Sequence, residues 1–254
     1  MKGTLYSLEG KVVKEIDLPN FFEESLRPDI IKRAVLSEES KTYQPKGNYR
    51  FAGLETSARY RGREGDYGSI SNRGISRRAR EVLPKGRFGK VKRIPGSVKG
   101  RRAHPPKPEK KIAEEINKKE YKKALKSALA FTADRKTVCR RMHVDIEMPL
   151  PIVIENSLEK ITKTKDVVNV LKALNMGPLL EKAKKNGSKG PLIIVSGEEG
   201  KPKAALNIPG VDVVSAKSLM VRHLAPGASP GRIAIFTEKA LEVLNERFAK
   251  VEVK

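Results

Sequence analysis

Eighteen lysine and arginine side chains lie between Lys46 and Pro108 of this 254-residue chain, and their chemistry is the binding of phosphate. The same stretch holds four acidic residues, so its net charge is 18 − 4 = +14, out of +23 for the whole chain. Twelve of the cations are arginines, whose planar guanidinium can hold a phosphate through two hydrogen bonds and can stack on a base. Five aromatic residues are interleaved and suit base stacking: Tyr49, Phe51, Tyr60, Tyr67 and Phe88. The stretch therefore favours a nucleic acid, and RNA above all, as its partner.

The backbone of this basic stretch is poorly suited to folding alone. It contains ten glycines and five prolines, and its apolar residues are not clustered. Such a segment cannot offset its chain entropy by burial, and its prolines disfavour a continuous helix. We expect it to be disordered in the free protein and to order on RNA, as arginine-rich segments do. The plain alternative is a solvated, flexible linker.

Other kinds of chemistry find little support in the sequence. The three histidines, His104, His143 and His223, are far apart and form no zinc-binding spacing. The single cysteine, Cys139, is expected to be a half-buried thiol, and one cysteine suits a reducing cytosol. The segment GEEGKPK (197–203) lacks the spacing and the hydroxyl of a Walker loop, and no GxSxG motif occurs. We therefore predict no catalytic residue, no metal ligand and no cofactor, and hence not an enzyme.

Membrane association is also disfavoured. No apolar run approaches the roughly 18 residues that a membrane-spanning helix needs. The first ten residues, MKGTLYSLEG, contain no apolar core of a signal peptide.

The residues on either side of the basic stretch predict one α/β domain. Four strand-like runs of nearly continuous apolar character are typical of strands covered on both faces, and helical segments separate them. Alternating strands and helices indicate a mainly parallel central sheet within a three-layer domain, although its strand order does not follow from the sequence. These runs are 151–155, 191–196, 211–215 and 231–237. The predicted domain comprises residues 1–45 and 108–254, with an extended basic loop over 46–107 inserted between its first two helices.

Shorter signals mark the ends of elements. Residues 4–8 and 11–16 predict a hairpin around Glu9-Gly10, and Pro28 opens the first helix. Asn117 and Glu120 predict a capping box for the second helix. Further caps are expected from Thr164, from Ser215 or Ser218, and from Thr237, and Gly177 is expected just past the end of a helix.

Several longer segments resemble a known family. They are KGRRAHPPKPEKK, INKKEYKKALKSALAFTA, MPLPIVIEN and LAPGASPGRIAIFTEKAL, together with the inserted basic loop. The chain closely resembles, over nearly its whole length, the large-subunit ribosomal protein family called L-four, in its archaeal and eukaryotic branch. The resemblance implies a body on the outside of the large ribosomal subunit in the cytoplasm. It also implies an extension that runs through ribosomal RNA to the peptide exit tunnel and helps to form a constriction there.

The resemblance and the charge pattern together give a set of expected contact residues. The implied partners are large-subunit ribosomal RNA, neighbouring large-subunit proteins, and nascent peptide near the tip of the loop. The tip is expected within Gly68–Arg87, with Arg73, Gly74, Arg77 and Arg78 facing the tunnel. The expected RNA-binding residues are the cations of the loop: Lys46, Arg50, Arg59, Arg61, Arg63, Arg73, Arg77, Arg78, Arg80, Lys85, Arg87, Lys90, Lys92, Arg93, Lys99, Arg101, Arg102 and Lys107.

Two other functional classes remain open at this point. One is a non-ribosomal RNA-binding or RNA-processing protein with a disordered basic arm, although no pair of convergent carboxylates or base is evident in the sequence. The other is a chromatin-type DNA-binding protein. A comparison of affinities for structured RNA and duplex DNA at equal salt separates these classes.

Overall fold

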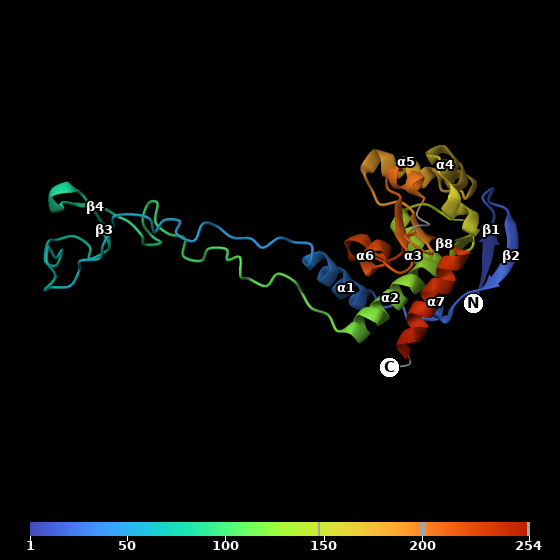
Figure 1. Ribbon diagram of the computed structural model, residues 1–254, viewed down its shortest axis with the longest axis horizontal. Coiled ribbons are helices and arrows are strands. Elements are labelled where there is room, and N and C mark those ends of the chain that lie inside the picture. The colour runs from blue at the N-terminus through green and yellow to red at the C-terminus, as the bar shows by residue number, and fades with distance from the viewer. Residues whose placement is uncertain (147, 199–201, 253–254) are drawn as a thin grey trace. The chain divides into compact units, whose positions relative to one another are not determined.

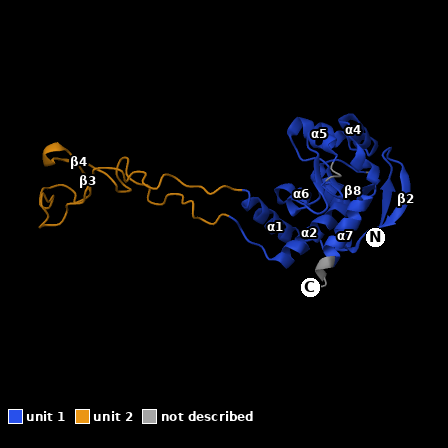
Figure 2. Cartoon of the chain, in the orientation of Figure 1, with its two compact units in different colours: residues 1–42, 113–254 blue, residues 43–112 orange. Residues whose placement is uncertain are grey.

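The computed structural model describes residues 1–146, 148–198 and 202–252. Residues 199–201, in the middle of the GEEGKPK segment, lie outside the described residues. The chain divides into two compact units, coloured separately in Figure 2. Residues 1–42 and 113–254 form the first, called the body here, and residues 43–112 form the second, called the extension.

A six-stranded, mostly parallel sheet forms the centre of the body (Figure 1). Its order is β2-β1-β5-β8-β6-β7, in which β1 and β2 pair antiparallel and all other neighbours pair parallel. The expected hairpin and the four expected parallel strands are confirmed. The strands are β1 (Lys2–Tyr6), β2 (Val12–Asp17), β5 (Ile152–Ile154), β6 (Leu192–Val195), β7 (Asp212–Ser215) and β8 (Ala234–Thr237).

Helices cover both faces of this sheet, which makes the three-layer α/β fold that the sequence predicts. Val153 packs in one apolar cluster with α1, α2, α6 and α7, whereas its neighbours Ile152 and Ile154 pack in a second cluster with α3, α4 and α5. Both faces of β5 are buried for this reason, and its apolar run is continuous. The helices are α1 (Pro28–Ser40), α2 (Lys118–Ala133), α3 (Arg135–Met142), α4 (Thr164–Ala173), α5 (Gly177–Asn186), α6 (Val221–Leu224) and α7 (Glu238–Glu252).

The expected capping box at the start of α2 is wrong. Asn117 occupies the N-cap position, but its side chain makes no capping hydrogen bond. Glu120 instead forms an ion pair with Arg33 of α1, at 2.6 Å between Nη1 and Oε1. The carboxylate that local sequence assigns to the helix end thus joins α2 to its neighbour.

The start of α6 is also capped from a distance. Glu38 of α1 accepts hydrogen bonds from the backbone N–H groups of Val221 (3.0 Å) and Arg222 (2.9 Å), and from the Tyr121 hydroxyl (2.6 Å). Ser215 and Ser218, the expected caps, direct their hydroxyls to Glu198 instead. A charged acceptor stabilises the first turn of a helix more than a neutral hydroxyl does, because it also interacts favourably with the helix dipole.

Three further end signals differ in detail from the prediction. Thr164 is the first residue of α4 rather than its cap, and the N-cap residue Lys163 makes no side-chain bond. Asn175, with φ of 56°, takes the left-handed position after α4, while Gly177 opens α5. Thr237 directly precedes α7, but its hydroxyl donates to Glu159 at 2.8 Å.

A buried arginine ties the loops at one edge of the sheet together. Arg232 is 1 % exposed, and its guanidinium donates to the carbonyl oxygens of Gly190 (2.7 Å), His223 (3.0 Å) and Gly210 (3.3 Å). It also forms an ion pair with Asp212, 2.7 Å between Nη2 and Oδ2. Because those carbonyls belong to three segments distant in the sequence, this one side chain fixes the loops before β6 and β7 and the end of α6.

The surroundings of the Asp212 carboxylate predict that the body loses stability at acid pH. Burial alone would raise its pKa, but Arg232 and Lys189 outweigh burial and lower the pKa below the ordinary 3.8. A lowered carboxylate pKa stabilises the fold above the unfolded value and loses that contribution as pH falls through the folded value. Asp212→Asn should therefore reduce stability at neutral pH and flatten its decline below about pH 4. Thermal unfolding between pH 3 and 7 measures this effect, with Asp145→Asn, at an exposed position, as the control. If the stability of Asp212→Asn falls with pH as steeply as that of the parent protein, the prediction is contradicted.

Candidate nucleic-acid interface

The extension contains a small antiparallel hairpin that the sequence did not predict. Its strands are β3 (Arg80–Val82) and β4 (Phe88–Val91), in which Arg80 pairs with Val91 and Val82 with Phe88. Arg59, from the outgoing arm, adds a bridge to Arg80 through two backbone hydrogen bonds of 3.0 and 3.2 Å. This part of the extension is ordered by backbone pairing between segments about 20 residues apart. Because the strands are so short, that pairing leaves no hydrophobic periodicity in the sequence.

The two arms of the extension lie side by side along much of their length. A Cβ on Gly47 would lie 2.5 Å from Pro108, and one on Gly53 would lie 2.6 Å from the backbone of Gly100 and Arg101. Gly53 also has φ of +75°, which side-chain-bearing residues rarely adopt. Glycine is required at Gly53 because the backbone of the other arm approaches it, and at Gly47 because the ring of Pro108 does.

A minimal apolar core accompanies the hairpin. Ala58 and Ile70 are each 1 % exposed, and the Ile70 N–H donates to the Arg61 carbonyl at 3.0 Å. Arg93 extends its guanidinium to the Ala58 carbonyl at 3.5 Å, a weak contact. This core is far smaller than that of the body, so burial contributes little to the order of the extension.

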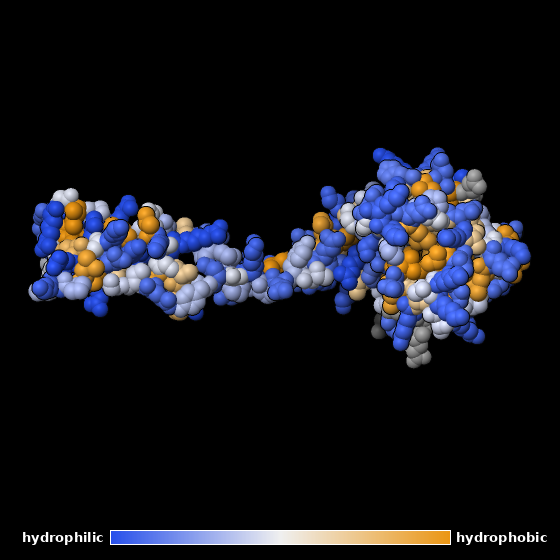
Figure 3. Space-filling view, turned by 90° about the horizontal axis from the view of Figure 1, so that it is seen from above, coloured by the Kyte–Doolittle hydropathy of each residue, from blue (hydrophilic) through white to orange (hydrophobic). Residues whose placement is uncertain are grey.

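Most of the expected RNA-binding cations are exposed on this scaffold. Three are half-buried: Arg61, Arg80, whose guanidinium reaches the Ser76 hydroxyl at 3.1 Å, and Lys92, whose ammonium reaches the Val98 carbonyl at 3.3 Å. Figure 3 shows hydrophilic side chains along the extension with apolar ones scattered among them. The other fifteen of the eighteen are exposed: Lys46, Arg50, Arg59, Arg63, Arg73, Arg77, Arg78, Lys85, Arg87, Lys90, Arg93, Lys99, Arg101, Arg102 and Lys107.

The residues expected at the tip lie in an exposed loop that precedes the hairpin. Gly74 adopts φ of 67°, and it is exposed together with Arg77 and Arg78. The Arg73 guanidinium lies over the Phe88 ring, 5.5 Å from its centroid, which places the loop against β4. Seven consecutive residues, 72–78, are exposed in this loop.

The aromatic residues differ in their readiness to stack on bases. Tyr49 packs edge-on to Phe51, with ring centroids 5.9 Å apart, and its hydroxyl donates to Glu55. Tyr67 is 96 % exposed and Tyr60 is 57 % exposed. Tyr49 and Phe51 are 59 % and 50 % exposed, so four of the five rings leave surface open to a base, and Tyr67 leaves the most.

The arrangement can bind a polyanion but offers no constellation for covalent chemistry. Among the residues that the structure describes, no group of three or more His, Cys, Asp and Glu side chains could hold a metal ion. Cys139 is half-buried on α3, as expected. Within the described part of the chain, no helix is long and apolar enough to cross a membrane.

Comparison with known proteins identifies the family. The model of the ribosomal protein L4/L1 family matches residues 16–247. The large ribosomal subunit protein uL4 of Methanocaldococcus jannaschii is 43 % identical over 265 residues, which covers 98 % of this chain and 100 % of that protein. The proteins of the same name from Archaeoglobus fulgidus and Sulfurisphaera tokodaii are 42 % and 40 % identical, each over 97 % of this chain and 99 % and 95 % of their own lengths.

The chain belongs to the ribosomal protein L4/L1 family.

This membership confirms the resemblance seen in the sequence segments, including its archaeal side. It also confirms the expectation of a structural protein rather than an enzyme. Arg232, a buried residue that joins several loops, was not singled out from the sequence. It stands in the segment that carries the resemblance, and its buried hydrogen bonds give a physical reason for an arginine there.

Proposed function

We propose that this protein is a structural constituent of the large ribosomal subunit, in which the extension binds ribosomal RNA and supports assembly. The fifteen exposed cations of the extension carry this proposal. The relatives named above are large ribosomal subunit proteins that align over nearly their full lengths, which supports the same role here. Neighbouring large-subunit proteins are further partners in this role.

The geometry of the extension supports RNA threading. Its two arms approach each other at glycines, so the cross-section is narrow where Gly47 meets Pro108 and where Gly53 meets Gly100. The cations project from this narrow core into solvent, where phosphates on several sides can reach them. A linker without a partner would not require such close backbone packing.

The exposed loop 72–78 is the part that we propose lines the peptide exit tunnel. Its side chains are all exposed, and it precedes the hairpin instead of pairing within it. In this role Arg73, Gly74, Arg77 and Arg78 meet water and nascent peptide, while the cations along the arms meet phosphate. Two kinds of position along one extension then have separable effects when they are changed.

The salt dependence of RNA binding tests the role of the arms. Arg93, Arg101 and Arg102 are exposed on the returning arm, which is the part of the extension that follows β4. Changing all three to Gln should reduce the slope of log K against log salt by about two to three units, since each phosphate contact contributes about 0.7–0.9. Filter binding to large-subunit ribosomal RNA from 50 to 400 mM salt measures the slope.

The matched control for this test removes three exposed lysines of the body, Lys163, Lys165 and Lys172, in the same way. Its slope should stay close to that of the parent protein. Equal slopes for the two triple variants would refute a specific role for the extension. Tighter binding to duplex DNA than to RNA at equal salt would point to the chromatin class instead.

A further inference from the structure

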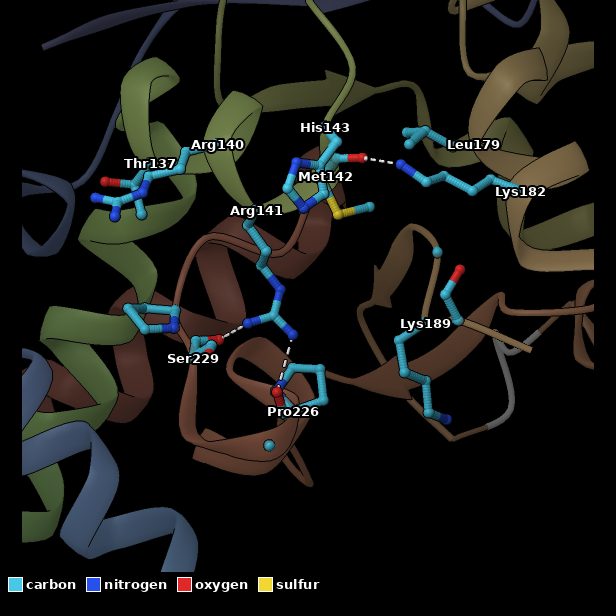
Figure 4. Close-up of a pocket in the computed structure, with 14 residues that line it drawn as sticks. Thr137, Arg140, Arg141, Met142, His143, Leu179, Lys182, Lys189, Pro226 and Ser229 are labelled. Atoms are coloured by element: carbon cyan, nitrogen blue, oxygen red, sulfur yellow. Dashed lines mark hydrogen bonds between the residues drawn. The ribbon is translucent and has the colours of Figure 1, made fainter. Parts of the chain in front are cut away.

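The body contains a pocket that the role of the extension leaves unexplained. Its walls are the end of α3, the helix α5 with residues 188–190 that follow it, and the loop 226–230 (Figure 4). Its volume is about 790 Å³. That volume is within the range of about 300–1,000 Å³ that small-ligand sites occupy. Every lining residue belongs to the body.

Among the described residues that line this pocket there are four Lys and Arg side chains and no carboxylate. Residues 135–143 contain four Lys and Arg and no acidic residue, and residues 182–189 contain four lysines and no acidic residue. Arg140, Arg141, Lys182 and Lys189 are among the lining residues. These eight cations exceed the acids that flank or pair with them, Asp134, Glu181 and, through Lys189, Asp212, so the surroundings of the pocket favour an anionic occupant.

Some of these cations hold the walls of the pocket. Arg141 donates to the carbonyl oxygens of Pro226 (2.8 Å) and Ser229, and Lys182 donates to the Met142 carbonyl at 3.1 Å. Figure 4 shows Arg141 reaching the loop at Pro226 and Ser229, and Lys182 of α5 reaching Met142 at the end of α3. The walls are therefore preformed, which lowers the entropic cost of binding.

Other cations near the pocket have no partner among the residues that the structure describes. Arg140, Lys184 and Lys185 are exposed, and in the described part of the chain their side chains make no hydrogen bond or ion pair. Within the body, burial lowers the pKa of Arg141, and the nearby Arg232 lowers it further by repulsion. An anion at the mouth of the pocket would relieve that repulsion.

The interior of the pocket is apolar. Met142 and Leu179 are buried and line it, and Pro226 and Pro230 line it from the loop. His143, which adopts a left-handed conformation with φ of 50°, also lines the pocket. A flat, largely apolar group fits between such walls, whereas the charged side chains of an acidic peptide would leave them unfilled.

We propose that this pocket receives an unstacked base of single-stranded RNA, while Arg140, Lys184 and Lys185 bind the flanking phosphates. Sequence-selective RNA recognition commonly uses bases that are splayed out of loops and packed against protein side chains. The assignment of the RNA to the large subunit rests on the proposed function, but the pocket itself is separate from the extension. The protein then has two RNA-binding sites of different character, one electrostatic and one that reads a base.

Methionine methyl NMR of the full chain tests this site directly. Met142 lines the pocket, Met148 and Met176 line a neighbouring cavity, and Met1 and Met220 line neither. Titration with a mixed-sequence single-stranded octaribonucleotide should shift the Met142 methyl signal saturably, because a stacked base exerts a ring current. The signals of Met1 and Met220 should not move.

Two variants and one control separate base insertion from charge. Ser188→Tyr places a ring at the exposed rim and should abolish the Met142 shift. Lys184→Gln with Lys185→Gln should keep the shift but reduce the salt slope of this binding event by about 1.4, which is two contacts of about 0.7. Lys165→Gln with Lys172→Gln, on the exposed side of α4, should change neither quantity.

Four results would overturn the inference. They are a static Met142 signal, an equal shift with duplex RNA, a shift with polyglutamate but not with RNA, and a mononucleotide that binds as tightly as the octamer. The third result assigns the pocket to a protein partner, and the fourth assigns it to a free nucleotide. None of them changes the salt slope contributed by the arms, so failure here is distinguishable from failure of the proposed function.

Discussion

Replacing Arg232 with methionine should lower the free energy of unfolding of the body by about 3–5 kcal/mol. The side chain is 1 % exposed and joins the carbonyls of Gly190, Gly210 and His223 to the Asp212 carboxylate. Methionine fills much of the volume but leaves several buried acceptors without a donor, and each such group costs about 1–3 kcal/mol. Asp212 keeps Lys189 as a partner at 3.0 Å, which limits the loss.

Thermal unfolding measures this effect as a fall in the midpoint of roughly 6–20 °C for a body of this size. The control is Arg135→Met on the exposed start of α3, which should shift the midpoint by no more than about 2 °C. Arg232→Lys should recover only part of the loss, because an ammonium cannot reach acceptors in a planar fork. One kcal/mol corresponds to about 2–4 °C here. If the midpoint of Arg232→Met stays within about 2 °C of the parent protein, the loops keep their positions without the arginine.

The strands of the body were predictable because burial on both faces leaves a strong mark. Runs such as 191–196 are almost wholly apolar, and Leu192, Ile193, Ile194 and Val195 are each 0 % exposed. Hydrophobic burial near 25 cal/mol per Å² dominates local preferences there. Composition and alternation alone therefore gave the fold class and the position of the parallel sheet.

Helix ends were less predictable because their partners come from distant segments. Glu38 caps α6 across about 180 residues of sequence, and Glu120 joins Arg33 instead of closing a local capping box. Local rules assign a cap to the nearest hydroxyl or amide, while the folded chain offers a better acceptor from another helix. Arg232 escaped notice for the same reason, since its acceptors are backbone carbonyls that sequence does not reveal.

The charge of the candidate site was readable from sequence, but its shape was not. The eighteen cations are evident from composition, and fifteen of them are exposed. The hairpin was missed because β3 and β4 have three and four residues and are joined to Arg59 by backbone bonds. The pocket near α3 also escaped prediction, since its walls come from three segments that are remote in sequence.

The largest functional effect is expected from reversing charge on the returning arm. Lys99, Arg101 and Arg102 are exposed beside Gly100, where the backbone of one arm approaches Gly53 of the other. Changing all three to Glu places carboxylates among phosphates, so attraction becomes repulsion. Each lost charge-assisted contact is worth about 1.5–3 kcal/mol, and three together should weaken RNA binding at least about a thousandfold. Subunit profiles should then show few mature large subunits.

The exposed loop 72–78 should behave in the opposite way. A Gly-Ser sequence of equal length in its place removes Arg73, Arg77 and Arg78 but spares Arg80, which pairs with Arg59 and Val91. Assembly should stay nearly intact, because the arms keep their phosphate contacts. Passage of nascent chains, or the response to antibiotics that bind the tunnel, should change, because the loop meets the peptide instead of RNA.

Subunit profiles and translation-stall assays on both variants decide between the two roles. Reversal of Lys163, Lys165 and Lys172 to Glu, on the body, changes the net charge by the same amount and should leave both readouts near those of the parent protein. If that control also blocks assembly, the effect belongs to net charge and not to the arm. If the loop variant blocks assembly while the charge reversal on the arm has no effect on assembly, the phosphate contacts lie in the loop and the arms do not contact RNA.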